Sequence, residues 1–340
     1  MSLGKTFGLS KHLKQLVLSR NEEIGDDGVR AFYESLSDAN NASIMESLET
    51  LDLAACNLGP LGMEALTKIL TNCPKRHLAL TLTSNPLKAG SSASISTLLC
   101  GTSRIRLLYL AHCEIGDTGV EQLSASIECE KCIGLSVLDL SHNGIGPEGA
   151  NKLALVMWRN GINHLENLVE LVLAGNNLGH VGVQSLVQAL VHKTEDGNLA
   201  SGNSTLTSLD LTQTNCGNDG AVAILRCTAL KKVRLFNNKL GNSGFIAIAR
   251  ELRGGHVSIE QLDVGGNNAT KEGVIRVIDA VGTILKEIDS KLNTLEVGGN
   301  ETGFEVEEAI KRMKTTRPGL DVARDKPRPQ QNEVDSLHCP

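Results

Sequence analysis

Several short motifs in this sequence have residue types and spacings that could support chemistry. Gly4-Lys5-Thr6 resembles the end of a phosphate-binding loop, but the earlier glycine and the preceding strand of that motif are missing. Cys129 and Cys132 have the spacing of a metal or redox pair, yet no second cysteine or histidine pair follows at ligand distance. We therefore predict no catalytic residue, no cofactor and no metal site.

A different chemistry, the recognition of another protein, is indicated by aromatic and charged residues at equivalent positions of two similar segments. Tyr109 and His112 lie in the first segment, and Asp139 and His142 lie in the second. A pair of histidines offers too few ligands for a metal ion. We interpret these four residues as a polar contact patch for a partner.

A basic cluster further along the chain is a second candidate contact site, and it consists of Lys231, Lys232, Arg234 and Phe236. Two interpretations remain open. The cations pair within the chain with Asp210 and Asp263, or the cluster anchors a partner, since arginine and aromatic residues dominate the binding energy of many interfaces.

All these candidates occupy a repeated pattern, L-x-x-L-x-L-x-x-N, whose copies begin at Leu13, Leu48, His77, Ile105, Leu135, Leu168, Leu206, Leu230, Ile259 and Leu292. A glycine signature such as Ile115-Gly116 with Gly119-Val120 follows most copies, and apolar residues at helical spacing come next. Each repeat is therefore predicted to be a strand, a turn and a helix. Because the glycines recur, we assign them to turn geometry and not to phosphate binding.

Stacking about ten such units predicts an α/β solenoid with a parallel sheet on the concave face and helices on the convex face, coiled in a right-handed horseshoe. The strand leucines should point inward, and an asparagine or cysteine at the ninth position should bond the backbone of neighbouring turns. The outward side chains should form columns. The middle column is predicted to be Val17, Asp52, Thr81, Tyr109, Asp139, Val172, Asp210, Arg234, Asp263 and Glu296.

The pattern resembles the ribonuclease-inhibitor class of leucine-rich repeats over Leu13–Val322. Two branches of that class are relevant, the nucleotide-sensor receptors and the Ran GTPase-activating proteins. The second branch implies a functional arginine on an early repeat and an acidic carboxyl-terminal tail. Arg20, on the first predicted strand, is the matching arginine, whereas the segment Ala323–Pro340 is not acidic.

Composition narrows the classes of partner and the cellular locations that remain possible. The formal net charge is only -6 over 340 residues, and the basic residues are scattered, which disfavours a nucleic-acid-binding surface. The cysteine count of 9 is odd, Met1–Ser10 has no hydrophobic signal core, and no apolar run is long enough for a membrane span. We expect reduced thiols and a cytoplasmic location, with a nuclear or perinuclear one as the alternative.

The predicted organisation is an edge or cap over residues 1–12, a solenoid over 13–322 that ends in a terminal strand at 320–322, and a disordered tail over 323–340. Ser37–Ser43 and Lys193–Ser204 are predicted surface loops. Trp158 is expected to pack against the fold, although a convex binding anchor is the alternative. As a whole, the sequence predicts a scaffold or regulator that binds a protein partner through its concave face. The alternative is a GTPase-activating regulator of a small Ran-like GTPase.

Overall fold

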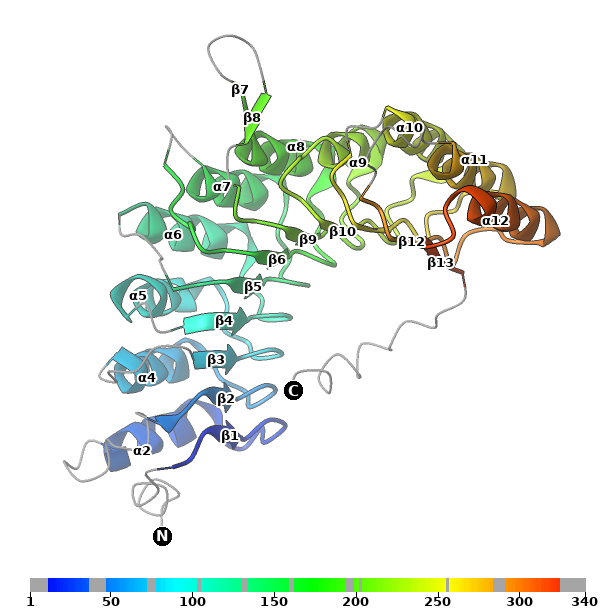
Figure 1. The fold of residues 1–340 in the computed structure, drawn as a ribbon. Helices are drawn as coiled ribbons and strands as arrows, with labels where there is room; N and C mark the ends of the chain where they lie inside the picture. Colours follow the sequence, from blue (N-terminus) through cyan, green and yellow to red (C-terminus); the bar gives the residue numbers. More distant parts are fainter. Residues whose placement is uncertain are drawn as a thin grey trace.

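An open arc of strand–helix units makes up the computed structural model, with the strands lining its inner side and the helices its outer side (Figure 1). It describes residues 12–324 apart from 37–46, 72–77, 103–104, 130–133, 159–161, 194–198, 202–203, 255–256 and 284–290. The predicted cap before His12, the loop at 37–43, most of the Cys129–Cys132 motif and the tail after Arg324 therefore lie outside the described residues.

The inner side is an 11-stranded sheet in which all neighbouring strands are parallel. Its order is β1 (Gln15–Val17), β2 (Thr50–Asp52), β3 (Leu78–Thr81), β4 (Ile105–Tyr109), β5 (Val137–Asp139), β6 (Glu170–Val172), β9 (Ser208–Asp210), β10 (Lys232–Arg234), β11 (Gln261–Asp263), β12 (Thr294–Glu296) and β13 (Asp321–Ala323). The predicted strands are confirmed, and β13 confirms the expected terminal strand.

Helices cover the outer side, one after most strands (Figure 1). They are α2 (Gly25–Leu36), α4 (Pro60–Thr71), α5 (Ser92–Thr102), α6 (Gly116–Cys129), α7 (Pro147–Met157), α8 (Gly179–Leu190), α9 (Gly217–Leu225), α10 (Gly241–Arg253), α11 (Lys271–Gly282) and α12 (Phe304–Thr316); a 3-10 turn, η1 (Ala89–Ser91), precedes α5. The predicted α/β horseshoe is confirmed.

The core lies between the sheet and the helices and is filled by aliphatic side chains. Leu138 and Leu140 of the fifth repeat have no exposed surface, and 1% of the surface of Leu153 is exposed. Burying one such side chain contributes about 1.5 to 3 kcal/mol, which is too little to order one repeat on its own. The stability of the arc is therefore shared among its stacked repeats.

The ninth-position residues form a ladder that ties each repeat to the one before it. Asn176 Oδ1 accepts hydrogen bonds from the backbone N–H groups of Asn143 (2.9 Å) and Ile145 (3.0 Å). Its Nδ2 donates to the carbonyl oxygens of Leu140 (2.8 Å) and Leu173 (3.0 Å). The predicted structural role of this position is confirmed.

Cysteine takes the same position in some repeats with a weaker donor. The Cys113 thiol donates to the carbonyl oxygen of Leu82 at 3.2 Å, while the Cys113 backbone N–H donates to Asn143 Oδ1 at 3.0 Å. Burial raises the pKa of this thiol to about 12. Cys113 therefore stays protonated at neutral pH and serves the ladder.

Glycine is required at the two positions of the repeat signature for different physical reasons. Gly116 has a φ of +61° with open space around its Cα, so it is needed for the left-handed backbone that starts α6. Gly119 is closely packed: a Cβ there would lie 2.5 Å from Ile115 Cγ2 of its own repeat and 3.2 Å from Ala89 Cα of the preceding repeat. The turn-geometry interpretation is therefore confirmed for Gly116, whereas Gly119 is explained by close packing.

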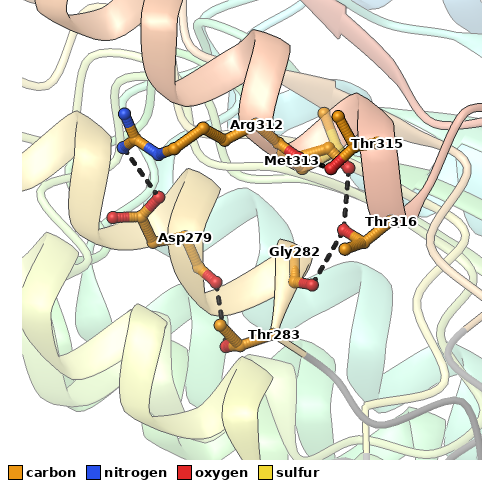
Figure 2. A network of polar contacts seen from close by, with 7 residues as sticks. All are labelled: Asp279, Gly282, Thr283, Arg312, Met313, Thr315 and Thr316. Carbon is orange, nitrogen blue, oxygen red and sulfur yellow. Dashed lines mark hydrogen bonds and ion pairs between the residues drawn. The ribbon is translucent and has the colours of Figure 1, made fainter.

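Side-chain contacts also join the outer helices near the carboxyl-terminal end of the arc. Figure 2 shows Arg312 of α12 beside Asp279 of α11, with an Nη2–Oδ1 distance of 3.3 Å. The Thr316 hydroxyl lies 2.9 Å from the Gly282 carbonyl oxygen and 2.8 Å from that of Met313. The last helix is thus held to its neighbour by polar as well as apolar contacts.

The sequence prediction was wrong for part of the Lys193–Ser204 loop. An antiparallel pair, β7 (Val191–Lys193) and β8 (Leu199–Ser201), continues from the end of α8 and projects from the arc (Figure 1). Despite this insertion, β6 pairs directly with β9. Trp158, at the end of α7, is partly buried against the core, which confirms the packing prediction.

Candidate functional site

The predicted middle column exists on the concave face in the predicted register. Tyr109 pairs with Asp139, Asp139 with Val172, and Arg234 lies between Asp210 and Asp263. Successive side chains in a column are about 5 Å apart because that is the spacing of strands in a sheet. The concave face is therefore a continuous surface built on rigid strands.

All four aspartates of this column support their own turns, a role that was not predicted from the sequence. Asp139 Oδ1 accepts hydrogen bonds from the Ser141 backbone N–H (2.8 Å) and hydroxyl (2.6 Å). Asp210 Oδ1 accepts one from the Thr212 N–H at 2.9 Å. Aspartate favours such bonds to the backbone two residues on. The small or hydroxyl residue two positions after each aspartate was the available signal.

His112 and His142 form a stacked pair at the edge of the concave face. Their ring centroids are 4.3 Å apart and their planes differ by 5°. Both residues have left-handed backbone, with φ of 56° and 53°. A Cβ on Gly175 would lie 2.2 Å from His142 Nδ1, so the His142 ring fills the space that a side chain would take. The expected adjacency of the two histidines is confirmed.

Both His142 and Tyr109 are affected by burial and by neighbouring charges. Burial lowers the pKa of His142, and the nearby His112 lowers it further. Burial raises the pKa of Tyr109, and the charges of Glu170 and Asp139 add to that increase. Both groups are thereby favoured in their neutral forms.

The basic cluster of the eighth repeat is partly neutralised within the chain. Arg234 Nη1 lies 3.1 Å from Asp210 Oδ2, and Lys231 Nζ lies 3.5 Å from Glu260 Oε1. Of the two interpretations, pairing within the chain holds for Arg234 with Asp210, while the pairing of Lys231 with Glu260 was not predicted. Lys232 faces the concave side in line with Ser208 and Gln261.

Phe236 packs over the two repeats that follow it. A Cβ on Gly265 or Gly266 would lie 2.8 or 2.7 Å from atoms of the Phe236 ring, and one on Gly299 would lie 3.7 Å away. The glycines thus provide the room for this ring. Phe236 remains partly exposed, so its outer face contributes to the concave surface.

Three neighbours of Tyr109 and Asp139 also belong to this surface and were missed by the sequence analysis. Leu107, Val137 and Glu170 are in line across β4, β5 and β6, two residues before the middle column. All three are partly exposed. The period-two alternation of the strands was the signal that could have identified them.

Arg20 lies in the turn that follows β1 and not on the strand, which corrects the sequence prediction. Its backbone is left-handed, with a φ of 62°, and its N–H donates to the Ala54 carbonyl oxygen at 2.8 Å. The side chain is exposed at one end of the arc. The structure therefore separates Arg20 from the residues around Tyr109 by several repeats.

Neither metal nor thiolate chemistry has a built site in the described part of the chain. No group of three or more histidine, cysteine, aspartate or glutamate side chains there could hold a metal ion. Burial raises the pKa of Cys216 and of Cys227 to about 12, which removes the reactive thiolate. Among the described helices, none combines the length and the apolar character that crossing a bilayer requires.

Comparisons with known proteins agree with this architecture. The Leucine Rich repeat family matches residues 9–32, 45–66, 105–124, 132–154, 164–187, 202–225 and 226–249. Ribonuclease inhibitor from Sus scrofa is 28% identical over 289 residues, which are 76% of this chain and 59% of the relative. NACHT, LRR and PYD domains-containing protein 3 from Bos taurus is 29% identical over 216 residues, which are 63% of this chain and 19% of the relative.

The chain thus spans less than two thirds of the length of each of these relatives. Among solved structures, the crystal structure of a TLR13–ssRNA13 complex aligns with 76% of this chain and 30% of that chain, at 16% identity and a TM-score of 0.41. That similarity is too distant to indicate a shared ligand.

Proposed function

Because this chain is a leucine-rich-repeat protein of the ribonuclease-inhibitor-like class, we propose that it is a binding protein that holds a protein partner against its concave face. The observation that carries the proposal is the set of aligned outward columns on parallel strands. Side chains held by such strands lose little conformational entropy on binding. The proposed contact residues are Tyr109, His112, Asp139, His142, Lys231, Lys232, Arg234 and Phe236.

The composition of this surface supports recognition of a protein. Aromatic and arginine side chains are enriched at the centres of interfaces, and Tyr109, Phe236 and Arg234 are all partly exposed. The relatives include a protein named for inhibiting ribonuclease. Binding and not catalysis is therefore the activity that we propose.

Site-specific crosslinking tests this proposal with the full chain. A photoreactive residue replaces Val172 on the concave face or, in the matched control, Val181 on the convex α8, where 52% of the side chain is exposed. We expect the concave probe to capture a partner that the convex probe does not. With the purified partner, Tyr109→Ala and Lys232→Glu should each weaken binding at least tenfold, about 1.4 kcal/mol.

Leu61→Ala on α4 is the control substitution for affinity, since 68% of Leu61 is exposed on the convex side. This substitution should change the affinity for the partner by less than twofold. Binding that is lost with Leu61→Ala and kept with Tyr109→Ala and Lys232→Glu would refute the concave-face proposal.

A GTPase-activating regulator of a small Ran-like GTPase is the second candidate function. The exposed position of Arg20 on the first repeat is the observation that favours it, because an arginine supplied in trans stabilises the transition state of GTP hydrolysis. If the chain accelerates hydrolysis by a small GTPase, Arg20→Ala should remove most of that acceleration and leave the unfolding midpoint unchanged. A panel of small GTPases without any acceleration would eliminate this candidate.

A further inference from the structure

A compact group of six side chains lies at the middle of the concave face. The central patch consists of Leu107, Tyr109, Val137, Asp139, Glu170 and Val172, two from each of β4, β5 and β6. All six are partly exposed. Their register places neighbours about 5 Å apart across the strands, so one partner side chain can contact several of them at once.

The apolar and acidic members of the central patch form two rows across the strands. In one row Val137 lies between Leu107 and Glu170, and in the other Asp139 lies between Tyr109 and Val172. Burial raises the pKa of Tyr109, and the negative charges of Glu170 and Asp139 raise it further. The patch therefore combines an aromatic ring, aliphatic walls and negative charge within one small area.

The central patch itself is acidic. Among its six side chains, Asp139 and Glu170 carry negative charge and none is a lysine or an arginine. Arg106 of β4, one residue before Leu107, is exposed next to the patch. The other half of the concave face is mixed in charge, since Lys232 and Arg234 lie there together with Asp210, Asp263 and Glu296, and Arg234 pairs with Asp210.

We propose that the central patch binds an arginine or lysine side chain that the partner protein presents between apolar residues. The proposal rests on the proposed function and specifies the chemistry of its partner. The cation would contact the Asp139 and Glu170 carboxylates and the Tyr109 ring, while its stem and neighbours would cover Leu107, Val137 and Val172. The turn bonds of Asp139 to Ser141 hold that carboxylate in place before binding.

A random library of 12-residue peptides displayed on phage, selected against the full chain, supplies defined probes. Affinities of individual enriched peptides are then measured by fluorescence anisotropy for the native chain, for two double variants, and for the single variants Lys232→Glu on the concave face and Leu61→Glu on the convex side. Asp139→Asn with Glu170→Gln neutralises the central patch and keeps the turn acceptor at position 139. Asp52→Asn with Glu296→Gln removes the same charge from the same face outside the patch and is the matched control.

We expect enriched peptides in which arginine or lysine is flanked by apolar residues. Their affinity should fall at least tenfold for the central-patch variant and less than threefold for the control, with unchanged circular dichroism for both. Neutral or acidic enriched peptides, equal losses for the two variants, or no enrichment would overturn this inference. Peptides that lose affinity only with Lys232→Glu would overturn it and leave concave binding intact, whereas peptides that lose affinity only with Leu61→Glu would oppose both proposals.

Discussion

Leu140 illustrates how a single residue contributes to this fold. It follows β5, has no exposed surface, and its N–H donates to the Val172 carbonyl oxygen at 2.9 Å. Leu140→Ala leaves a cavity that stacked neighbours cannot easily close, so we expect a loss of about 2 to 5 kcal/mol in the free energy of unfolding. Urea denaturation measures it. Val17→Ala, at a side chain that is 61% exposed, should change little; equal effects would contradict the assigned register.

A second prediction for a single residue concerns His142 and the pH dependence of folding stability. Burial and His112 lower its folded-state pKa, whereas the unfolded value is about 6.5. The unfolded chain therefore binds more protons below that value, so this contribution to stability is complete above about pH 6.5 and is lost as the pH falls toward the folded-state pKa. We expect the urea midpoint to decrease between about pH 7.5 and pH 5.5.

His142→Asn should reduce that decrease, since asparagine tolerates the left-handed backbone but does not titrate. His180→Asn on α8 is the control for an exposed histidine and should leave the pH dependence as it is. An unchanged pH dependence for His142→Asn would contradict the assignment of the pH-dependent loss of stability to His142.

The sequence predicted which residues occupy the middle column, but it did not predict all of their roles. The register from Val17 to Glu296 follows from the period of the strands and is confirmed. That Asp139 supports its own turn and that the His142 ring covers Gly175 depend on backbone conformations after the strand. A two-residue period carries no information about those conformations.

At the scale of elements, the glycines that open the helices allow a matched comparison. Gly116→Ala meets no atom within 4 Å but must adopt a φ of +61°, which costs an L-residue about 1 to 2 kcal/mol. Gly119→Ala instead drives a methyl group against Ile115 and Ala89. We expect both substitutions to lower the melting temperature in thermal denaturation.

Asparagine distinguishes the two causes. Gly116→Asn should be milder than Gly116→Ala because asparagine adopts left-handed backbone more easily. Gly119→Asn should be more damaging than Gly119→Ala because it adds volume at a close contact. The reverse order at either position would show that its glycine has been assigned the wrong cause.

Strand and helix elements were predictable because each repeats the same pattern, and the departures occur where the pattern is interrupted. Residues 191–201 contain β7 and β8, yet this polar stretch has no apolar periodicity that would predict strands. Arg20 was assigned to the first strand, which ends at Val17. Strand ends depend on local turn geometry and not on the spacing of leucines.

For the whole molecule, the stacked arrangement predicts a gradient of local stability along the arc. The Leu18 N–H donates to the Asp52 carbonyl oxygen at 2.8 Å, a bond nearly identical to that of Leu140 at 2.9 Å. Leu140, however, has repeats on both sides, whereas Leu18 is in the first described repeat. Native-state hydrogen exchange should therefore be much slower at Leu140, because terminal repeats open first. Equal exchange rates would show that the arc opens as a single unit.

The direct pairing of β6 with β9 has a consequence for how the chain can change over evolutionary time. An insertion between two strands is accommodated on the outer side and does not shift the pairing of any strand, as β7 and β8 demonstrate. The lineage of such a protein can therefore acquire or lose segments, or even an entire foreign domain between Lys193 and Leu199, without altering the inner surface. The length of the segments on the outer side and the residues that line the inner surface can therefore change independently of each other.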